Sequence, residues 1–395
     1  MHLLDCYSLN CGLKIGKPFI LEKFFPLNID KFITFEPEGM FPSRQYDYWD
    51  DVLDILEPIL SEHDIKILQI GSNASNFKFS KVYNVSGQAS TNQQAYLINK
   101  SILHLGTDGF SNHVASHYGK KIVSLFSDSP PSNNGPLFSR QEDLSLIIPD
   151  LKGKKHSYSV EEKDKTINTI KPEQIAQEVC SLIDVPFNYN FETVSMGSKY
   201  NDRSVELIPD GEAVDPSNLS VDSLIMRMDL SHNEISLAKQ LQVCPCNIIT
   251  CKPISLHLLK AFQARIAQFV YVIGDNDSKQ FVEELFSMGI QCLLMSEKEG
   301  EELEKLKFKY LDYGKIHSRN LTKKEDLNFL KNEDLNNLYF RSNKYLIHDG
   351  QVFNSLASFE NGNNSLELGS RQFQKVIESE SFWKEADNFM FVRKN

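Results

Sequence analysis

Four polar loops in the first half of the sequence contain residue types that bind anions, and each follows a run of apolar residues. Small residues let backbone amides approach a phosphate closely, and a following helix would point its positive end at the same place. The third loop combines both features, although its plainer interpretation is a tight turn capped by Asp108. The loops are 36–44 (Glu36-Pro-Glu-Gly-Met-Phe-Pro-Ser-Arg44), 71–75 (Gly71-Ser-Asn-Ala-Ser75), 106–113 (Gly106-Thr-Asp-Gly-Phe-Ser-Asn-His113) and 127–136 (Ser127-Asp-Ser-Pro-Pro-Ser-Asn-Asn-Gly-Pro136).

The elements that must position these loops alternate between strand and helix patterns. Such alternation predicts a parallel sheet covered by helices on both faces, and in an open parallel sheet a ligand binds at the carboxyl ends of the strands. His104 lies inside one strand pattern and is predicted to be a core histidine. Strands are expected at 31–35, 65–70, 82–85, 101–105 and 121–126, and helices at 48–61, after Ser90, at 113–118 and at 171–183.

A second alternating region follows a polar segment rich in proline and glycine. That segment, 186–218, is predicted to be a linker between domains 1–185 and 219–395. Near the end, Asp349-Gly350 suits a type I′ turn in a hairpin over 345–353. We therefore expect an α/β fold of two Rossmann-like domains with a small C-terminal β-hairpin region. Strands of the second domain are expected at 223–228, 247–251, 269–273 and 291–295.

Composition excludes several classes of protein. A chain of 395 residues is too long for one core, and 42 basic against 53 acidic residues give a net charge of −11. Such an acidic chain is not expected to bind nucleic acid or a membrane through a basic patch. No apolar run is long enough for a transmembrane segment, and Asp5 argues against a signal peptide, so a cytoplasmic protein is expected.

The seven cysteines are odd in number and scattered, which favours reduced thiols. Cys244, Cys246 and Cys251 invite a zinc interpretation. Their spacing does not suit a structural zinc site, which needs a second pair of ligands. Small buried side chains are the preferred interpretation, and no metal is expected.

Taken together, the four loops resemble a known family in order and spacing. Residues 1–185 resemble the nucleotide-sugar-binding half of family 9 glycosyltransferases, the heptosyltransferase group with the GT-B architecture. A GT-B-like fold is therefore implied, with a nucleotide sugar as donor substrate and no other cofactor. The matching segments are 35–39 with 42–46, 84–93, 108–115 with 119–120, and 124–130 with 135–136.

The sequence also departs from the family pattern. Phe110 stands where the family has glycine in its phosphate turn, and Arg44 stands where the family has lysine. The segment His2-Leu-Leu-Asp-Cys-Tyr7 resembles the closing helix of the acceptor domain, which normally comes first. Three alternatives follow: the acceptor domain is absent, the domain after 218 replaces it in a rearranged order, or a partner protein supplies it.

The resemblance implies a role for nine residues. The loop after the fourth strand would hold the diphosphate, and Arg44 would neutralise the leaving group in place of a metal. The end of the third strand would line the nucleobase. The diphosphate residues are Asp108, Gly109, Phe110, Ser111 and His113, with Ser43 and Arg44 facing the phosphates and Ser86 and Gly87 at the base.

Inverting transfer also needs a general base, which the family takes from its acceptor domain. At strand ends of the second domain, Asp229, His232 and Asp275 are candidates, with helix caps or solvated carboxylates as the alternative. The expected function is metal-independent, inverting sugar transfer to a glycan, a cell-surface polysaccharide or a lipid-linked saccharide.

Two other functions remain open. Phe110 favours a non-catalytic nucleotide-sugar or glycan-binding scaffold with a degenerate GT-B fold. A glycosyltransferase acting on modified DNA is the third hypothesis, and the net charge of −11 argues against it. A homo-oligomer is an open alternative, as is a partner protein that supplies the acceptor half.

Overall fold

A computed structural model describes residues 1–71, 79–216, 221–275, 277–318, 322–362, 365–367 and 369–395. The chain divides into unit 1, residues 1–191, and unit 2, residues 192–395. Among the described residues, no helix combines the length and the hydropathy that crossing a membrane would require.

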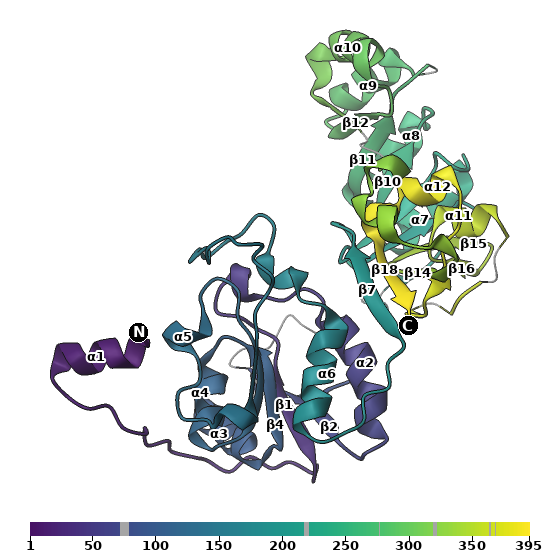
Figure 1. Cartoon of the computed structure of the whole chain (residues 1–395). Helices are drawn as coiled ribbons and strands as arrows, with labels where there is room; N and C mark the ends of the chain where they lie inside the picture. The colour runs from purple at the N-terminus through teal and green to yellow at the C-terminus, as the bar shows by residue number, and fades with distance from the viewer. Residues whose placement is uncertain (72–78, 217–220, 276, 319–321, 363–364, 368) are drawn as a thin grey trace. The chain divides into compact units, whose positions relative to one another are not determined.

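Unit 1 is built on a six-stranded parallel sheet with the order β3-β2-β1-β4-β5-β6. Figure 1 shows α2 beside α6 on one face of this sheet and α3 beside α4 on the other. The predicted parallel sheet with helices on both faces is confirmed. The strands are β1 (Phe32–Glu36), β2 (Lys66–Gln69), β3 (Tyr83–Asn84), β4 (Leu103–Thr107), β5 (Lys121–Leu125) and β6 (Leu144–Ile147). The helices are α1 (Leu3–Cys11), α2 (Trp49–Ser61), α3 (Thr91–Lys100), α4 (Phe110–His117), α5 (Pro131–Asn134) and α6 (Pro172–Leu182).

Local sequence explains where these helices form. Helix α2 buries Val52, Leu56 and Leu60 on one face, as its helical spacing predicts. Helix α3 begins with a capping box, in which Ser90 and Gln93 satisfy each other's backbone N–H groups. The apolar spacing of α2 and the capping box of α3 thus explain one helix on each face of the sheet.

Unit 2 contains an eight-stranded sheet with the order β13-β12-β11-β10-β9-β8-β15-β16. From β8 to β13 each strand lies next to its predecessor in the chain, and all these strands are parallel. The strands are β8 (Ser204–Leu207), β9 (Ser223–Arg227), β10 (Cys246–Thr250), β11 (Ile266–Val272), β12 (Cys292–Ser296), β13 (Ile316–Ser318), β15 (Lys344–His348) and β16 (Gln351–Phe353). The connecting helices are α7 (Glu234–Val243), α8 (Leu256–Ala261), α9 (Lys279–Ser287) and α10 (Gly300–Lys309).

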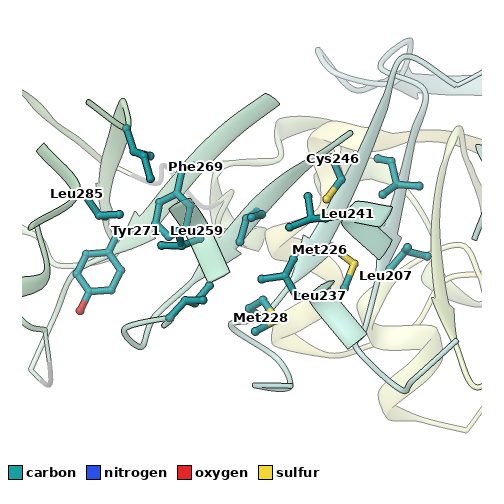
Figure 2. Close-up of a cluster of buried hydrophobic side chains, with 14 of the residues drawn as sticks. Leu207, Met226, Met228, Leu237, Leu241, Cys246, Leu259, Phe269, Tyr271 and Leu285 are labelled. Carbon is teal, nitrogen blue, oxygen red and sulfur yellow. The ribbon is translucent and has the colours of Figure 1, made fainter. Parts of the chain in front are cut away.

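Right-handed crossovers that all move in one direction place α7 to α10 on one face of the sheet. A single apolar core fills the space between this face and the helices. Figure 2 shows part of it, with Leu237 and Leu241 of α7 near Met226 of β9. The other face of the same strands carries Glu206 and Arg227, because neighbouring side chains of a strand alternate between faces.

The predicted hairpin is confirmed. Strands β15 and β16 are antiparallel, and Asp349 and Gly350 between them have φ angles of 48° and 68°. Positive φ at both central residues defines the type I′ turn. Strand β15 also pairs in parallel with β8, so the hairpin extends the large sheet.

The prediction of a linker at 186–218 is wrong for much of that segment, because two strands of unit 2 lie in it. One is β8, with four buried residues, and the other is β7 (Phe191–Met196). Proline and glycine between the strands give this segment the composition of a linker. Strand β7 joins a smaller sheet with β14 (Leu338–Ser342), β17 (Gln374–Lys375) and β18 (Phe389–Lys394), near α11 (Leu356–Glu360) and α12 (Glu380–Lys384).

Candidate functional site

The strand order of unit 1 reverses between β1 and β4, and in open α/β sheets such a reversal places a crevice outside the carboxyl ends of the two strands. From β1 the chain continues to β2 on one side, and from β4 it continues to β5 on the other. Because the connecting loops leave in opposite directions, the carboxyl ends of β1 and β4 form a topological switch point, where ligands of open α/β sheets bind. Glu36 ends β1, and Asp108 follows β4 at this place.

A line of buried polar side chains leads to Glu36. Thr34 lies 3.1 Å from Nδ1 of His104, and Nε2 of His104 lies 2.8 Å from Oγ of Ser111. The Ser111 hydroxyl donates to Oε2 of Glu36. Burial lowers the pKa of His104 to about 3, so its ring is neutral. A neutral ring that accepts from Thr34 and donates to Ser111 satisfies every link, and His104 is therefore a core histidine that also supports the crevice.

Glu36 is a potential acid or base that the sequence analysis missed. Burial raises its pKa to about 7, the hydrogen bond from Ser111 works in the opposite direction, and the charge of Glu38 adds a smaller increase. The residue as a whole keeps an intermediate solvent exposure. A carboxyl group that titrates near neutral pH can exchange a proton with a substrate.

We expect unit 1 to lose stability as the pH rises from 4.5 to about 7. Folded Glu36 keeps its proton up to a pKa of about 7, whereas the unfolded chain releases it near the ordinary value of 4.5, so the folded state binds more protons in this range. The loss is about 2 kcal/mol after allowance for partial exposure. Urea unfolding in a Trp383→Phe background, with Trp49 as the probe of unit 1, measures it.

The comparison that isolates Glu36 uses two variants. Glu36→Gln should remove this part of the pH dependence, because an amide does not titrate. Glu142→Gln, at an exposed position, should leave it unchanged. An identical slope in the wild type and in Glu36→Gln would show that another group is responsible.

Arg44 lies between two carboxylates. Its Nη1 is 2.7 Å from Asp108, and its Nε and Nη2 donate to the two oxygens of Asp128 at 2.9 and 3.0 Å. The Arg44 side chain is only 15% exposed. One positive charge against two negative ones leaves this cluster without a surplus of positive charge. Any phosphate that binds Arg44 must therefore compete with Asp108 and Asp128.

Asp108 does not cap α4, as the plainer interpretation of its loop required. The N-cap residue is Gly109, and no side chain caps the helix. Asp108 instead contacts Arg44 and accepts from Asn134 at 2.5 Å. Burial raises the pKa of Asp108, while Arg44 and Asn134 oppose that increase. Its role is to join the loops after β1, β4 and β5.

Ser43 does not face an open phosphate site in this structure. The residue is fully buried, its hydroxyl donates to the carbonyl of Ser159 at 2.7 Å, and its N–H donates to that of Val160 at 3.1 Å. The loop around Ser159 thus covers Ser43. A Cβ on Gly39 would lie 2.6 Å from the Arg44 carbonyl oxygen, so only glycine allows this loop to fold so tightly.

The N-terminus of α4 retains the features of an anion site. Within the described residues, the backbone N–H groups of Gly109 and Phe110 have no acceptor. Phe110, at the first turn, is 61% exposed, so its side chain is not part of the core. The carboxyl group of Glu36 lies beside Gly109, at 3.7 Å from where a Cβ would be.

Ser86 and Gly87 follow β3, at the same edge of the sheet. Three strand spacings of about 4.8 Å separate β3 from β4, roughly 14 Å, so only an extended ligand reaches both ends. Ser86 is buried, and its N–H donates to Asn84 at 2.9 Å, which forms the turn. In the loop 71–75, only Gly71 lies within the described residues.

His113 lies one turn into α4. Burial lowers its pKa, and the nearby His2 lowers it further. His2 is the N-cap of α1 and contacts the carbonyl of Gly135 at 3.0 Å. His113 is therefore close enough to the N-terminal segment to interact electrostatically with His2.

The three candidates for the general base all lie in unit 2. Both oxygens of Asp229 accept hydrogen bonds from Arg227 at 2.8 Å, so this carboxylate is already paired with a guanidinium group. His232 lies 3.7 Å from Glu234. Asp275 is 81% exposed and lies 2.9 Å from Lys298. Of the three, only Asp229 lines a described cavity. In the part of the chain that the structure describes, no three His, Cys, Asp or Glu side chains are grouped as metal ligands.

No profile of a known protein family matches the chain, and no curated protein sequence matches it. Similar solved structures include a glycosyl transferase of family 9 from Veillonella parvula, with 16% identity over 46% of this chain and 50% of that chain and a TM-score of 0.30. E. coli ADP-heptose lps heptosyltransferase II shows 15% identity over 46% and 51%, with a TM-score of 0.31. E. coli heptosyltransferase WaaC with ADP shows 8% identity over 45% and 54%, with a TM-score of 0.32.

These structures include members of the family that the four loops resemble. The chain spans about half the length of each of them. At this identity, the likeness concerns the fold alone.

Proposed function

We propose that this protein is a glycosyltransferase that takes a sugar from a nucleoside-diphosphate sugar bound to unit 1. The observation that supports this most directly is the switch point between β1 and β4. There, the Glu36 carboxyl group, whose pKa burial raises to about 7, lies beside the N-terminus of α4. A helix N-terminus with open N–H groups suits a diphosphate, and Glu36 suits proton transfer.

In this proposal the diphosphate lies on Gly109, Phe110 and Ser111, and the nucleobase lies near Ser86 and Gly87. Arg44 stabilises the leaving diphosphate after it exchanges Asp108 and Asp128 for phosphate oxygens. Charge-assisted contacts of a guanidinium with phosphate offset that exchange. No metal is needed, and the acceptor is a glycan, a polysaccharide or a lipid-linked saccharide. His113 and Ser43 support the loops rather than the phosphates.

Within unit 1, Glu36 is the candidate for the general base. Glu36 joins Asp229, His232 and Asp275 as a candidate in this proposal. Its pKa of about 7 lets it accept a proton near neutral pH, whereas Asp229 is held by Arg227.

We expect Arg44 and Asp128 variants to change nucleotide affinity in opposite directions. Arg44→Ala should weaken binding roughly 100-fold, because a bidentate charged contact contributes about 3 kcal/mol. Asp128→Asn should tighten binding about tenfold, since a competing carboxylate is removed. Arg140 lies elsewhere in unit 1, and its side chain is 73% exposed. Arg140→Ala should therefore leave nucleotide affinity unchanged.

Thermal shifts with ADP, GDP, UDP, CDP and their sugar conjugates, in EDTA, provide the measurement. A ligand at about 100 times its dissociation constant stabilises by about 2.7 kcal/mol. Because Arg44→Ala leaves two carboxylates without their cation, Arg44→Lys is included as a variant that keeps the charge. If no nucleotide shifts the melting temperature, or if Asp128→Asn weakens binding, the assignment fails.

A second candidate function is a nucleotide-sugar or glycan-binding scaffold without catalysis. The pairing of Arg44 with two carboxylates and the burial of Ser43 favour it. Nucleotide binding without sugar transfer or hydrolysis would support the scaffold. Transfer in the presence of EDTA would support the enzyme.

A further inference from the structure

Unit 2 contains a polar cavity of about 630 Å³, within the size range of small-molecule sites. It reaches the segments that follow β9 and β12, where Asp229 and Glu297 lie. Arg227 lines the cavity and lies on the sheet face opposite the core that Figure 2 shows. The cavity therefore adjoins that opposite face. All the residues that line this cavity belong to unit 2.

A chain of five alternating charges forms one wall of this cavity or lies directly behind it. Arg227 contacts Asp229 at 2.8 Å and Glu206 at 2.5 Å. Lys344 contacts Glu206 at 2.8 Å and Glu385 at 2.7 Å. The side chains are between 4% and 13% exposed, and all except Glu206 line the cavity.

Stability alone does not explain such a chain. Removing charges from water costs several kcal/mol per ion, and apolar residues of similar volume are often at least as stable. These charged side chains nevertheless line a cavity at the end of a strand, where functional sites of parallel sheets occur. Within the described residues, three of the five N–H groups of Arg227 donate hydrogen bonds to Asp229 and Glu206. In that part of the chain, the other two remain as donors for a ligand.

We propose that this cavity binds an uncharged polyhydroxylated ligand, namely a saccharide. Four basic and six acidic residues line it, so the wall repels phosphates and nucleotides. A hydroxyl group can donate to a carboxylate and accept from an ammonium or guanidinium group at once, which suits alternating charges. An adjoining cavity of about 500 Å³ shares Glu297, Glu380 and Lys384 with the first, so the site extends beyond one sugar ring.

The two tryptophans of the chain allow a direct test on the full-length protein. Trp383 lines the adjoining cavity of unit 2, and Trp49 lies in α2 of unit 1. With 5-fluorotryptophan incorporated, each gives one fluorine NMR signal, and Trp383→Phe assigns them. The probes are maltotriose, cellotriose and chitotriose, with ADP for comparison. At least one trisaccharide should shift the Trp383 signal and leave that of Trp49 in place.

Two lining variants then locate the binding. Asp387→Asn and Lys199→Met each change a residue of the cavity wall outside the buried chain, and each should weaken binding about tenfold. Glu304→Gln, on α10 and paired with Lys307, should leave affinity unchanged. The inference is overturned if no trisaccharide shifts the Trp383 signal, if ADP shifts it instead, or if Glu304→Gln weakens binding equally. The inference depends on residues of unit 2 alone, so its failure would not affect the function proposed for unit 1.

Discussion

Replacing Arg227 by methionine is expected to lower the free energy of unfolding of unit 2 by about 3 to 5 kcal/mol. Arg227 is 4% exposed and is the cation between Glu206 and Asp229. Lys344 and Arg227 together lower the pKa of Glu206 to about 2, against the opposing effect of burial. Without Arg227, two carboxylates would stay buried with less compensation, and the desolvation of each would count against folding.

The measurement is urea unfolding followed by Trp383 fluorescence in a Trp49→Phe background. The matched control is Arg393→Met, whose arginine also contacts two carboxylates but is 43% exposed, and this substitution should cost far less stability than Arg227→Met. Adding Glu206→Gln and Asp229→Asn to Arg227→Met should restore part of the stability. Equal costs for Arg227→Met and Arg393→Met would contradict the assignment of a buried charge chain.

Gly197→Ala is expected to destabilise unit 2 by about 3 kcal/mol. Gly197 follows β7, and its N–H donates to the carbonyl of Phe389 at 2.8 Å. A Cβ at this position would lie 2.2 Å from the Asp387 carbonyl oxygen and 2.4 Å from its carbon. Because these are backbone atoms, the conflict is relieved only by separating β7 from β18.

Gly274→Ala is the control, since nothing lies within 4 Å of its Cβ position and its φ is not positive. Hydrogen exchange of the β18 amides reports the separation directly, and they should lose protection in Gly197→Ala only. If β18 stays protected and unit 2 unfolds at the same urea concentration, the close approach at Gly197 does not exist in solution.

Periodicity was enough to predict the large elements of both units. Strands β1, β2, β4 and β5 and helix α2 lie within about two residues of the predicted ranges, because their apolar residues recur clearly. Strands β6, β7, β8 and β13 are among those that were missed, together with the smaller sheet's β14, β17 and β18. The first four are six residues long or shorter and contain serine, threonine, glutamate or histidine, so sheet pairing and tertiary packing determine them rather than local pattern.

The loops of the unit 1 site were predictable, but their contacts were not. That Asp108 and Asp128 both reach Arg44 depends on β4 and β5 being neighbours, which strand order decides and spacing does not reveal. Likewise, the sequence predicts Ser43 as a phosphate ligand, but in the folded structure the loop around Ser159 covers it. The pKa of Glu36 is raised to about 7 because the fold buries this residue, with a smaller increase from the charge of Glu38 and against the hydrogen bond from Ser111.

Because the helices of unit 2 cover one face of its sheet, alternate residues of each strand are under two different kinds of evolutionary constraint. At Leu224 and Met226, whether a substitution is tolerated depends on how well the core repacks around it. One residue away, Arg227 belongs to the opposite face, where a substitution is tested by charge and by the cavity. Because the two sets interleave without contact, the chemistry of one face can drift while the scaffold that carries it stays constant.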